Sequence, residues 1–221
     1  MDTELLPLFP LSTVLYPGAP LPLHVFEERY REMVRDLVSN SDRRWFGVVA
    51  VRHGSEVGES APSLYDVGCI AVVRRVDAYP DGRFDIVTAG GPRFRISELD
   101  QSRSYLRATV GLLDEEYGDR AEDGAVAARA ALAAYWEVLC GIRGERIAMA
   151  PVADDPLELS YLASTVLQLD VAEKQALLEC RNAAERIAAA TSLLRREAGL
   201  LTHLAAAPRG DELGAAPVSL N

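Results

Sequence analysis

The stretch LLPLFPLSTVLYPGAPLPLHVF, residues 5–26, decides how the first part of this sequence folds. It carries no charge when His24 is neutral, and its 22 residues are long enough for a membrane span. Its five prolines exclude a spanning helix, because each removes a backbone donor and its ring clashes with the preceding turn. The acidic residues before it argue against a signal peptide. We therefore predict buried extended chain, no membrane partner and a cytoplasmic protein.

Beyond this stretch, runs of aromatic and β-branched residues predict a strand-rich first half. The expected strands are 5–9, 14–16, 21–26, 45–51, 67–78, 83–89, 92–99 and 105–113. Apolar residues at helical spacing predict one long helix over about 27–39, and Gly90-Gly91 predicts a turn between two strands. So many short strands with a single helix indicate a small, closed or nearly closed β-barrel.

The second half is predicted to be helical. An alanine-rich run begins after the acidic segment 114–119, and both Asp155-Pro156-Leu157-Glu158 and Asp170-Val171-Ala172-Glu173 are helix starts with an N-cap residue. A last helix is expected over about 182–198, so this half is a bundle of about four helices. The predicted class is α+β, with a β-barrel subdomain at 1–116, a helical subdomain at 117–204 and a disordered tail at 205–221.

Charge and cysteine content argue against several function classes. The sequence has 33 acidic against 23 basic side chains, a net charge of −10, which argues against nucleic-acid binding because that affinity rests on Lys and Arg. Cys69, Cys140 and Cys180 are odd in number and form no C-x-x-C motif, so neither a disulfide framework nor a zinc site is expected. We predict no cofactor and no metal.

Several ordered motifs together resemble a known family. They are LPLFPL at 6–11, YPG at 16–18, LPLHVFE at 21–27, RY at 29–30, FGVV at 46–49, VGC at 67–69, DGR at 81–83, RFRI at 93–96, LSYL at 159–162 and EKQALLE at 173–179. Over residues 5–200 the chain resembles the amino-terminal substrate-binding domain of Lon-type proteases. The resemblance implies a PUA-like β-barrel with one long helix, followed by the helical bundle.

The catalytic modules of a full Lon protease are not expected in these 221 residues. Its ATPase needs a lysine in a Gly-Lys-Ser/Thr phosphate loop, and the sequence has no Gly-Lys pair. Its protease pairs a serine with a lysine, and Lys174, the single lysine, lies beside Glu173 where a solvated helix surface is expected. His24, His53 and His203 form no local metal or triad motif. We predict no enzyme activity and no catalytic residue.

The leading hypothesis is a non-catalytic, stand-alone Lon substrate-binding-like protein. It would bind extended polypeptide, or a partner such as a separate protease or chaperone, in a groove between barrel and bundle. The candidate binding residues are Phe26, Tyr30, Trp45, Trp136 and Tyr161. The residues that carry the resemblance, with structural roles expected, are Pro10, Pro17, Gly18, Pro22, His24, Glu27, Arg29, Gly47, Gly68 and Arg93. Two alternatives remain open: a small-ligand or enzymatic site in the barrel, and RNA binding by the PUA-like half.

Overall fold

The computed structural model describes residues 3–39, 44–53, 63–144 and 152–206. Its strands are β1 (Thr3–Leu11), β2 (Pro20–Val25), β3 (Trp45–His53), β4 (Ser63–Leu64), β5 (Val67–Ala78), β6 (Phe84–Asp100) and β7 (Arg107–Leu112). Its helices are α1 (Glu28–Ser39), α2 (Ala121–Arg143), α3 (Pro156–Val166), α4 (Val171–Glu179) and α5 (Ala183–Ala206). We call residues 3–112 the β half, 113–120 the linker and 121–206 the helical half. The predicted α+β class is confirmed.

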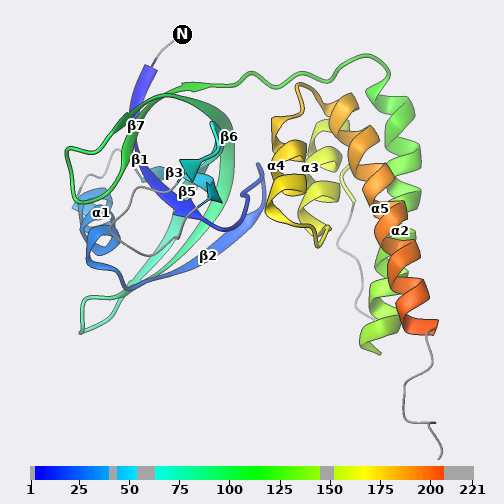
Figure 1. Cartoon of the computed structure of the whole chain (residues 1–221), viewed down its shortest axis with the longest axis horizontal. Coiled ribbons are helices and arrows are strands. Elements are labelled where there is room, and N and C mark those ends of the chain that lie inside the picture. The colour runs from blue at the N-terminus through cyan, green and yellow to red at the C-terminus, as the bar shows by residue number, and fades with distance from the viewer. Residues whose placement is uncertain (1–2, 40–43, 54–62, 145–151, 207–221) are drawn as a thin grey trace, which may run out of the picture.

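The strands form one mixed sheet, and the pairing between β1 and β3 joins five of them in a ring (Figure 1). Its order is β1-β7-β6-β5-β3, and β3 then pairs with β1 in parallel, with Leu8 opposite Gly47. The other pairings are antiparallel. β2 pairs with the first part of β6, residues 84–89. The prolines of the opening stretch lie in or beside β1 and β2, and these two strands are extended as predicted. The prediction that the whole stretch is buried and extended is wrong in part, because β2 is largely exposed on one face and residues 12–19 form bends and a turn.

Two details of the predicted strands are wrong. β6 runs without a turn through Gly90 and Gly91, neither of which has a positive φ. A Cβ on Gly90 would lie 2.0 Å from the carbonyl oxygen of Tyr16, so this glycine allows a close backbone approach. Leu15 and Tyr16 are buried, but the apolar run at 14–16 forms no strand, because it leads directly into the turn at Pro17-Gly18.

Two glycines of the quoted motifs make room for one aromatic ring inside the sheet. Phe94 is fully buried between β1, β3 and β5. A Cβ on Gly47 would lie 2.7 Å from Cζ of Phe94, and a Cβ on Gly68 would lie 2.5 Å from the same atom. Interiors pack at crystal-like density, so these positions need the smallest residue.

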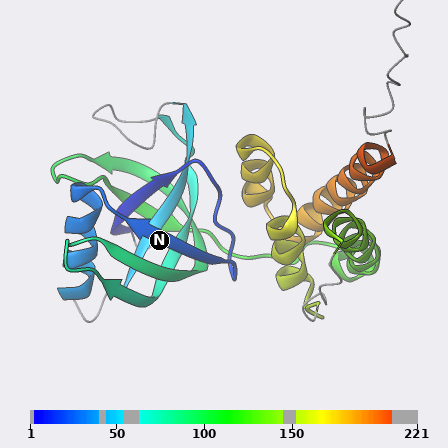
Figure 2. The same ribbon diagram turned by 90° about the horizontal axis from the view of Figure 1, so that it is seen from below.

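The helical half begins its short helices at the predicted caps. The side chain of Asp155 accepts a hydrogen bond from the backbone N–H of Glu158, and that of Asp170 accepts one from Glu173. α2 and α5 run parallel to each other, while α3 and α4 lie between this pair and the sheet in both views (Figures 1 and 2). α5 continues to Ala206, two residues into the segment predicted as a tail. The remaining tail lies outside the described residues.

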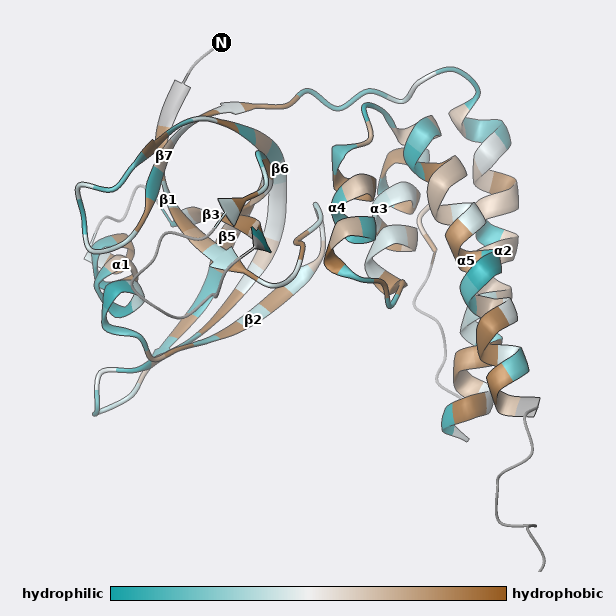
Figure 3. Cartoon of the chain, viewed as in Figure 1, coloured by the Kyte–Doolittle hydropathy of each residue, from teal (hydrophilic) through white to brown (hydrophobic). Residues whose placement is uncertain are grey.

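α2 is long and apolar enough to cross a membrane by length and composition alone. Its buried residues Ala125, Ala128, Leu132 and Tyr135 belong to the protein core, and it packs against α3 and α5. Figure 3 shows apolar residues on both helices toward their C-terminal ends, where Ile142 and Leu204 are exposed. We therefore describe α2 as a helix of the helical half.

One hydrophobic cluster crosses from the sheet into the helices. It contains Tyr16 and Val67 of the β half and Leu159, Leu177 and Leu178 of the helical half. Burial of apolar surface drives this contact, at about 25 cal/mol per Å² removed from water. The two halves are therefore joined by a shared core as well as by the linker.

Candidate functional site

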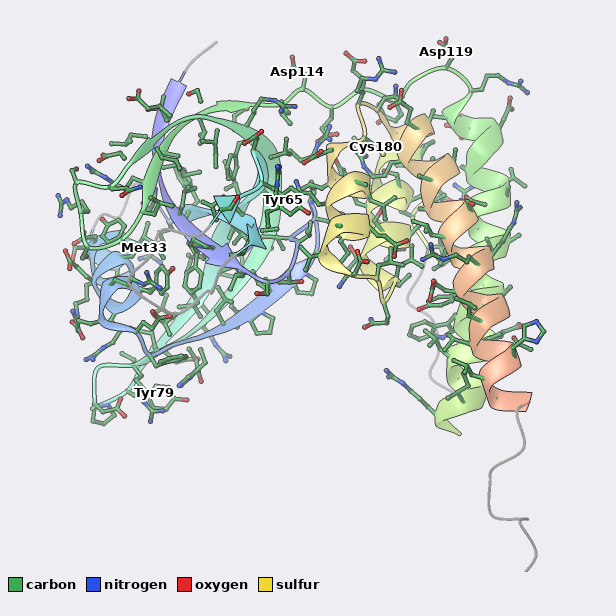
Figure 4. The ribbon with its side chains drawn as sticks, in the orientation of Figure 1. Met33, Tyr65, Tyr79, Asp114, Asp119 and Cys180 are labelled. Atoms are coloured by element: carbon green, nitrogen blue, oxygen red, sulfur yellow. The ribbon has the colours of Figure 1, made fainter. Side chains whose placement is uncertain are left out.

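A groove of about 640 Å³ lies where the two halves meet. Its lining comes from the β1–β2 connection with the first residue of β2, the middle of β6, the linker, the segment before α3, and α3 itself. The lining residues are Pro17, Gly18, Ala19, Pro20, Gly91, Pro92, Glu115, Ala153, Leu157, Glu158, Tyr161, Leu162 and Thr165. In Figure 4 the linker from Asp114 to Asp119 bridges the two halves beside this region.

The β-half wall is a turn fastened to the sheet. Gly18 has a φ of +78°, which glycine adopts without strain and other residues rarely do. Its N–H donates to the carbonyl of Gly90 at 3.0 Å, and the N–H of Gly90 donates to the carbonyl of Ala19 at 2.8 Å. These reciprocal bonds hold the Pro17–Pro20 segment against β6, so this wall is fixed in place.

The opposite wall is one face of α3. Leu157, Tyr161, Leu162 and Thr165 fall at helical spacing on this face, and Asp155 starts the helix just before them. The wall is mainly apolar, and its one acidic group on the helix, Glu158, is exposed. A groove with apolar walls and an acidic rim suits a ligand with apolar groups and no negative charge.

A buried polar network supports the floor of the groove. Nε of Arg93 donates to Oε1 of Glu115 at 2.8 Å and its Nη2 donates to Oε2 at 3.2 Å, a bidentate pair. The Tyr161 hydroxyl donates to Oε1 of Glu115 at 2.7 Å. Nη1 of Arg93 donates to the carbonyls of Leu178 and Cys180, both at 2.7 Å. One guanidinium on β6 thus holds the linker and the end of α4.

Arg186 on α5 completes this network from behind. Its side chain is fully buried, and it donates to the carbonyls of Leu177 and Cys180 and to the hydroxyl of Ser160. Its guanidinium carbon lies 3.9 Å from the ring centroid of Tyr161. Burial raises the pKa of the Tyr161 hydroxyl far above its usual value, so this group stays protonated and donates.

Two further hydrogen bonds fasten α4 to the β half. The hydroxyl of Tyr16 donates to the carbonyl of Lys174 at 2.8 Å, and Nε2 of Gln175 donates to the carbonyl of Val67 at 3.0 Å. Figure 4 labels Cys180, which lies between the end of α4 and the start of α5. With the Arg93 network, these contacts fix the orientation of the halves, and the groove is preformed.

The five aromatic candidates do not gather in this groove. Only Tyr161 lines it. Tyr30 is buried and stacks on Phe9, with ring centroids 4.2 Å apart. Trp45 packs against the Phe94 cluster, Trp136 is half-buried on α2, and Phe26 is exposed at the end of β2. The sequence shows that each of these residues is large and aromatic. It does not show which part of the molecule each residue occupies.

The residues that carried the resemblance divide into three groups. Pro17, Gly18 and Arg93 build the groove or its floor. Pro10, Gly47 and Gly68 are buried in the sheet. Exposed Pro22 and His24 lie on β2, where Nδ1 of His24 contacts Oδ1 of Asp85 at 2.6 Å, and Glu27 pairs with Arg29 at 2.9 Å.

Sequence reasoning missed Glu115 and Arg186. Glu115 lies in the acidic segment read only as a domain boundary, and nothing local sets it apart from Glu116. Arg186 had a signal, because it falls three residues after Ala183 and four before Ala190, both buried on α5. A charge within an apolar stripe is buried only with partners, so its position predicts a network.

The described residues give no support for metal binding or for nucleophilic catalysis. Within these ranges, no group of three or more His, Cys, Asp or Glu side chains could hold a metal ion. Burial raises the pKa of the Cys69 thiol far above its usual value, which makes it a poor nucleophile. Lys174 is half-buried on α4, less exposed than expected. His53 and His203 lie far apart in the chain.

Comparison with known proteins places this geometry in a family context. The ATP-dependent protease La (LON) substrate-binding domain family matches residues 5–196. The Lon protease of Trichlorobacter lovleyi is 30% identical over 206 residues, covering 90% of this chain and 25% of that protein. The Lon protease of Koribacter versatilis is 28% identical over 183 residues, covering 80% and 22%. The chain thus spans about a quarter of the length of these curated relatives.

Two solved structures share the fold. The Lon N-terminal domain protein from Xanthomonas campestris superposes with a TM-score of 0.59 at 22% identity, covering 93% of this chain and 99% of that one. The N-terminal domain of the Mycobacterium avium complex Lon protease gives 0.61 at 18% identity, covering 86% and 98%. The match runs through both halves of the molecule.

Proposed function

Because the chain belongs to the ATP-dependent protease La (LON) substrate-binding domain family, we propose that it binds extended polypeptide in the groove between its two halves. The observation that carries the proposal is the preformed groove itself, whose apolar α3 wall faces a fastened turn of the β half. Its volume of about 640 Å³ is that of a specific ligand site, and it accommodates a few apolar side chains of an extended segment.

The chemistry of the groove favours particular segments. Leu157, Leu162 and the ring of Tyr161 offer apolar surface, while exposed Glu158 disfavours acidic residues nearby. We propose segments in which apolar residues alternate with neutral or basic ones. Such segments are exposed in unfolded proteins, and a separate protease or chaperone is a partner that would use the same surface.

Capture by side chains fits the structure better than strand addition at the edge of β2. Among the described strands β2 pairs only with β6, so its other edge is a potential template. Proline has no N–H to donate, and β2 carries Pro20 and Pro22. Prolines on an edge strand are a known means of preventing pairing with another chain.

We propose further that these residues bind and do not catalyse. The support is chemical: the single lysine follows a glutamate and not a glycine, and its backbone carbonyl accepts a bond from buried Tyr16. The ring of strands is proposed to be a small barrel of the PUA-like type. The reducing cytoplasm is the proposed setting, since the described cysteines are all free thiols.

The test is a binding measurement on the groove. A fluorescein-labelled, permanently unfolded polypeptide is titrated with the protein and followed by anisotropy. Leu162→Glu places a charge on the α3 wall and is expected to weaken binding at least about tenfold. Val126→Glu is the matched control, because Val126 is 69% exposed on α2, away from the groove, and it is expected to bind as the parent does. Equal affinity of both variants would refute the groove as the site.

A further inference from the structure

A second pocket lies on the β half at the end far from the helical half. It has a volume of about 290 Å³ between the last turns of α1, the start of β3 and the outer parts of β5 and β6. Its lining residues are Val34, Leu37, Val38, Arg44, Val73, Arg74, Arg75, Val76 and Ile86. Figures 1 and 2 both place α1 on the side of the sheet away from α2–α5, so this pocket is separate from the groove.

The floor of this pocket is apolar. Val34 and Ile86 are almost fully buried, and they belong to the main core. Val38 is 48% exposed at the rim, although its branched side chain is apolar. An apolar hollow that is open to water is a place where an apolar group gains by leaving solvent.

The rim of the pocket is basic. Arg44, Arg74 and Arg75 are exposed there, on a chain whose net charge is −10. Arg75 pairs with Asp77 at 2.9 Å, whereas no described carboxylate lies within ion-pair distance of Arg44 or Arg74. The nearby acid on α1, Asp36, accepts from the hydroxyl of Tyr105 at 2.8 Å. Among the described residues, these two guanidinium groups therefore have no carboxylate partner, and we infer that they can meet an external anion.

We propose that this pocket binds a small amphipathic carboxylate. The alkyl or aryl chain lies on Val34, Val38 and Val76, and the carboxylate accepts hydrogen bonds from Arg44 and Arg74, since guanidinium groups match carboxylate geometry. The volume favours a small molecule over a peptide segment. At about 290 Å³ the pocket is at the lower limit of ligand pockets, ~300–1,000 Å³.

The backbone brings the two arginines to neighbouring positions. The N–H of Val73 donates to the carbonyl of Arg44 at 2.8 Å, which joins the start of β3 to β5 beside the pocket. Arg44, directly before β3, and Arg74 on β5 are therefore close along the backbone, and both line the pocket. A carboxylate that enters between them is attracted by both, and the valines below exclude water from its chain.

The test is titration of the full chain with sodium octanoate by calorimetry, with methyl NMR to locate the site. We expect octanoate to bind and to shift the methyl signals of Val38, Val73 and Val76. Octylammonium, which has the same chain and the opposite charge, and acetate, which lacks the chain, are expected to bind at least about tenfold more weakly.

Variants of the pocket rim test whether octanoate binding depends on its arginines and on its apolar surface. The double change Arg44→Gln and Arg74→Gln is expected to weaken octanoate binding at least about tenfold. Arg181→Gln, which removes an arginine 85% exposed in the helical half, is the control and is expected to leave binding unchanged. Val38→Asp is expected to abolish binding by placing a negative charge at the rim.

Three results would overturn the proposal. They are equal affinity for octanoate and octylammonium, methyl shifts confined to the α3 groove, and an acidic peptide that binds at this pocket where octanoate does not. Because the polypeptide groove lies on another face, failure of either proposal leaves the other standing.

Discussion

Replacing Glu115 by glutamine tests whether the buried network holds the two halves together. The carboxylate of Glu115 receives two bonds from Arg93 and one from the hydroxyl of Tyr161. Glutamine keeps the size of the side chain and one acceptor oxygen, but it removes the negative charge and turns the second oxygen into a donor. The guanidinium of Arg93, 2% exposed, then remains buried without its counter-charge.

The expected cost follows from that burial. Removing one partner of a fully buried ion pair costs ~3–5 kcal/mol, because the other charge is left uncompensated. The Glu115 side chain is 24% exposed, and Arg93 keeps its bonds to two carbonyls, so solvent and backbone offset part of this cost. We expect the free energy of unfolding to fall by about 2–3 kcal/mol.

Urea denaturation measures this loss, with fluorescence as the signal. The two tryptophans lie one in each half, Trp45 on β3 and Trp136 on α2, so single-tryptophan versions report each half separately. The matched control is Glu173→Gln. Arg196 also makes a bidentate pair with Glu173, through Nη1 and Nη2 at 2.6 and 3.1 Å, but on the surface. Such pairs contribute about 0–1 kcal/mol.

The shared core predicts that both tryptophans report one transition in the parent chain. In the Glu115→Gln protein both transitions are expected at lower urea, since the network lies between the halves. The reasoning is refuted if Glu115→Gln costs no more than Glu173→Gln, or if only one half is destabilised.

Three further predictions concern packing, helix capping and pH. Gly68→Ala places a Cβ 2.5 Å from Phe94 and is expected to cost at least about 2 kcal/mol in thermal unfolding. Gly111→Ala, where no heavy atom lies within 4 Å, is the control and should change stability by less than about 0.5 kcal/mol. Asp155→Ala removes the cap of α3 and is expected to cost about 1 kcal/mol by urea titration, with Asp155→Asn recovering most of it. The backbone N–H of Glu158 lowers the pKa of Asp155 in the folded state, so its stabilisation is complete above the unfolded pKa and lost as pH falls through the folded one. Stability of the parent should therefore fall below about pH 4 more steeply than that of Asp155→Asn, and equal slopes would contradict this origin.

Local signals in the sequence were sufficient for most elements of the fold. The prolines at 7, 10, 17, 20 and 22 excluded a helix over the opening stretch, and Asp155 and Asp170 marked helix starts that the structure contains. These features act within a few residues of themselves, through missing donors and side-chain caps. A pattern of that range can be read without knowing any tertiary contact.

The position of the groove, between the two halves, was predicted from the sequence, but most of its lining residues were not. Pro17, Gly18 and Tyr161 were among the residues singled out, whereas Glu115 looked like any other acid of the linker. Its role depends on Arg93, 22 residues earlier, and on Tyr161, 46 residues later. No local pattern encodes a bond at such separations.

The sequence by itself determined the α+β class, the extended strands of the opening stretch, the helix caps and the family, because these depend on local conformation and on ordered motifs. Only the tertiary structure decided that β6 continues without a turn through Gly90-Gly91. It also decided that Tyr30 lies in the core, that Tyr161 lines the groove, and that Arg93 makes hydrogen bonds to the helical half. The physical reason is that burial and charge pairing depend on which distant segments pack together, and the same aromatic or arginine serves the core or a surface accordingly.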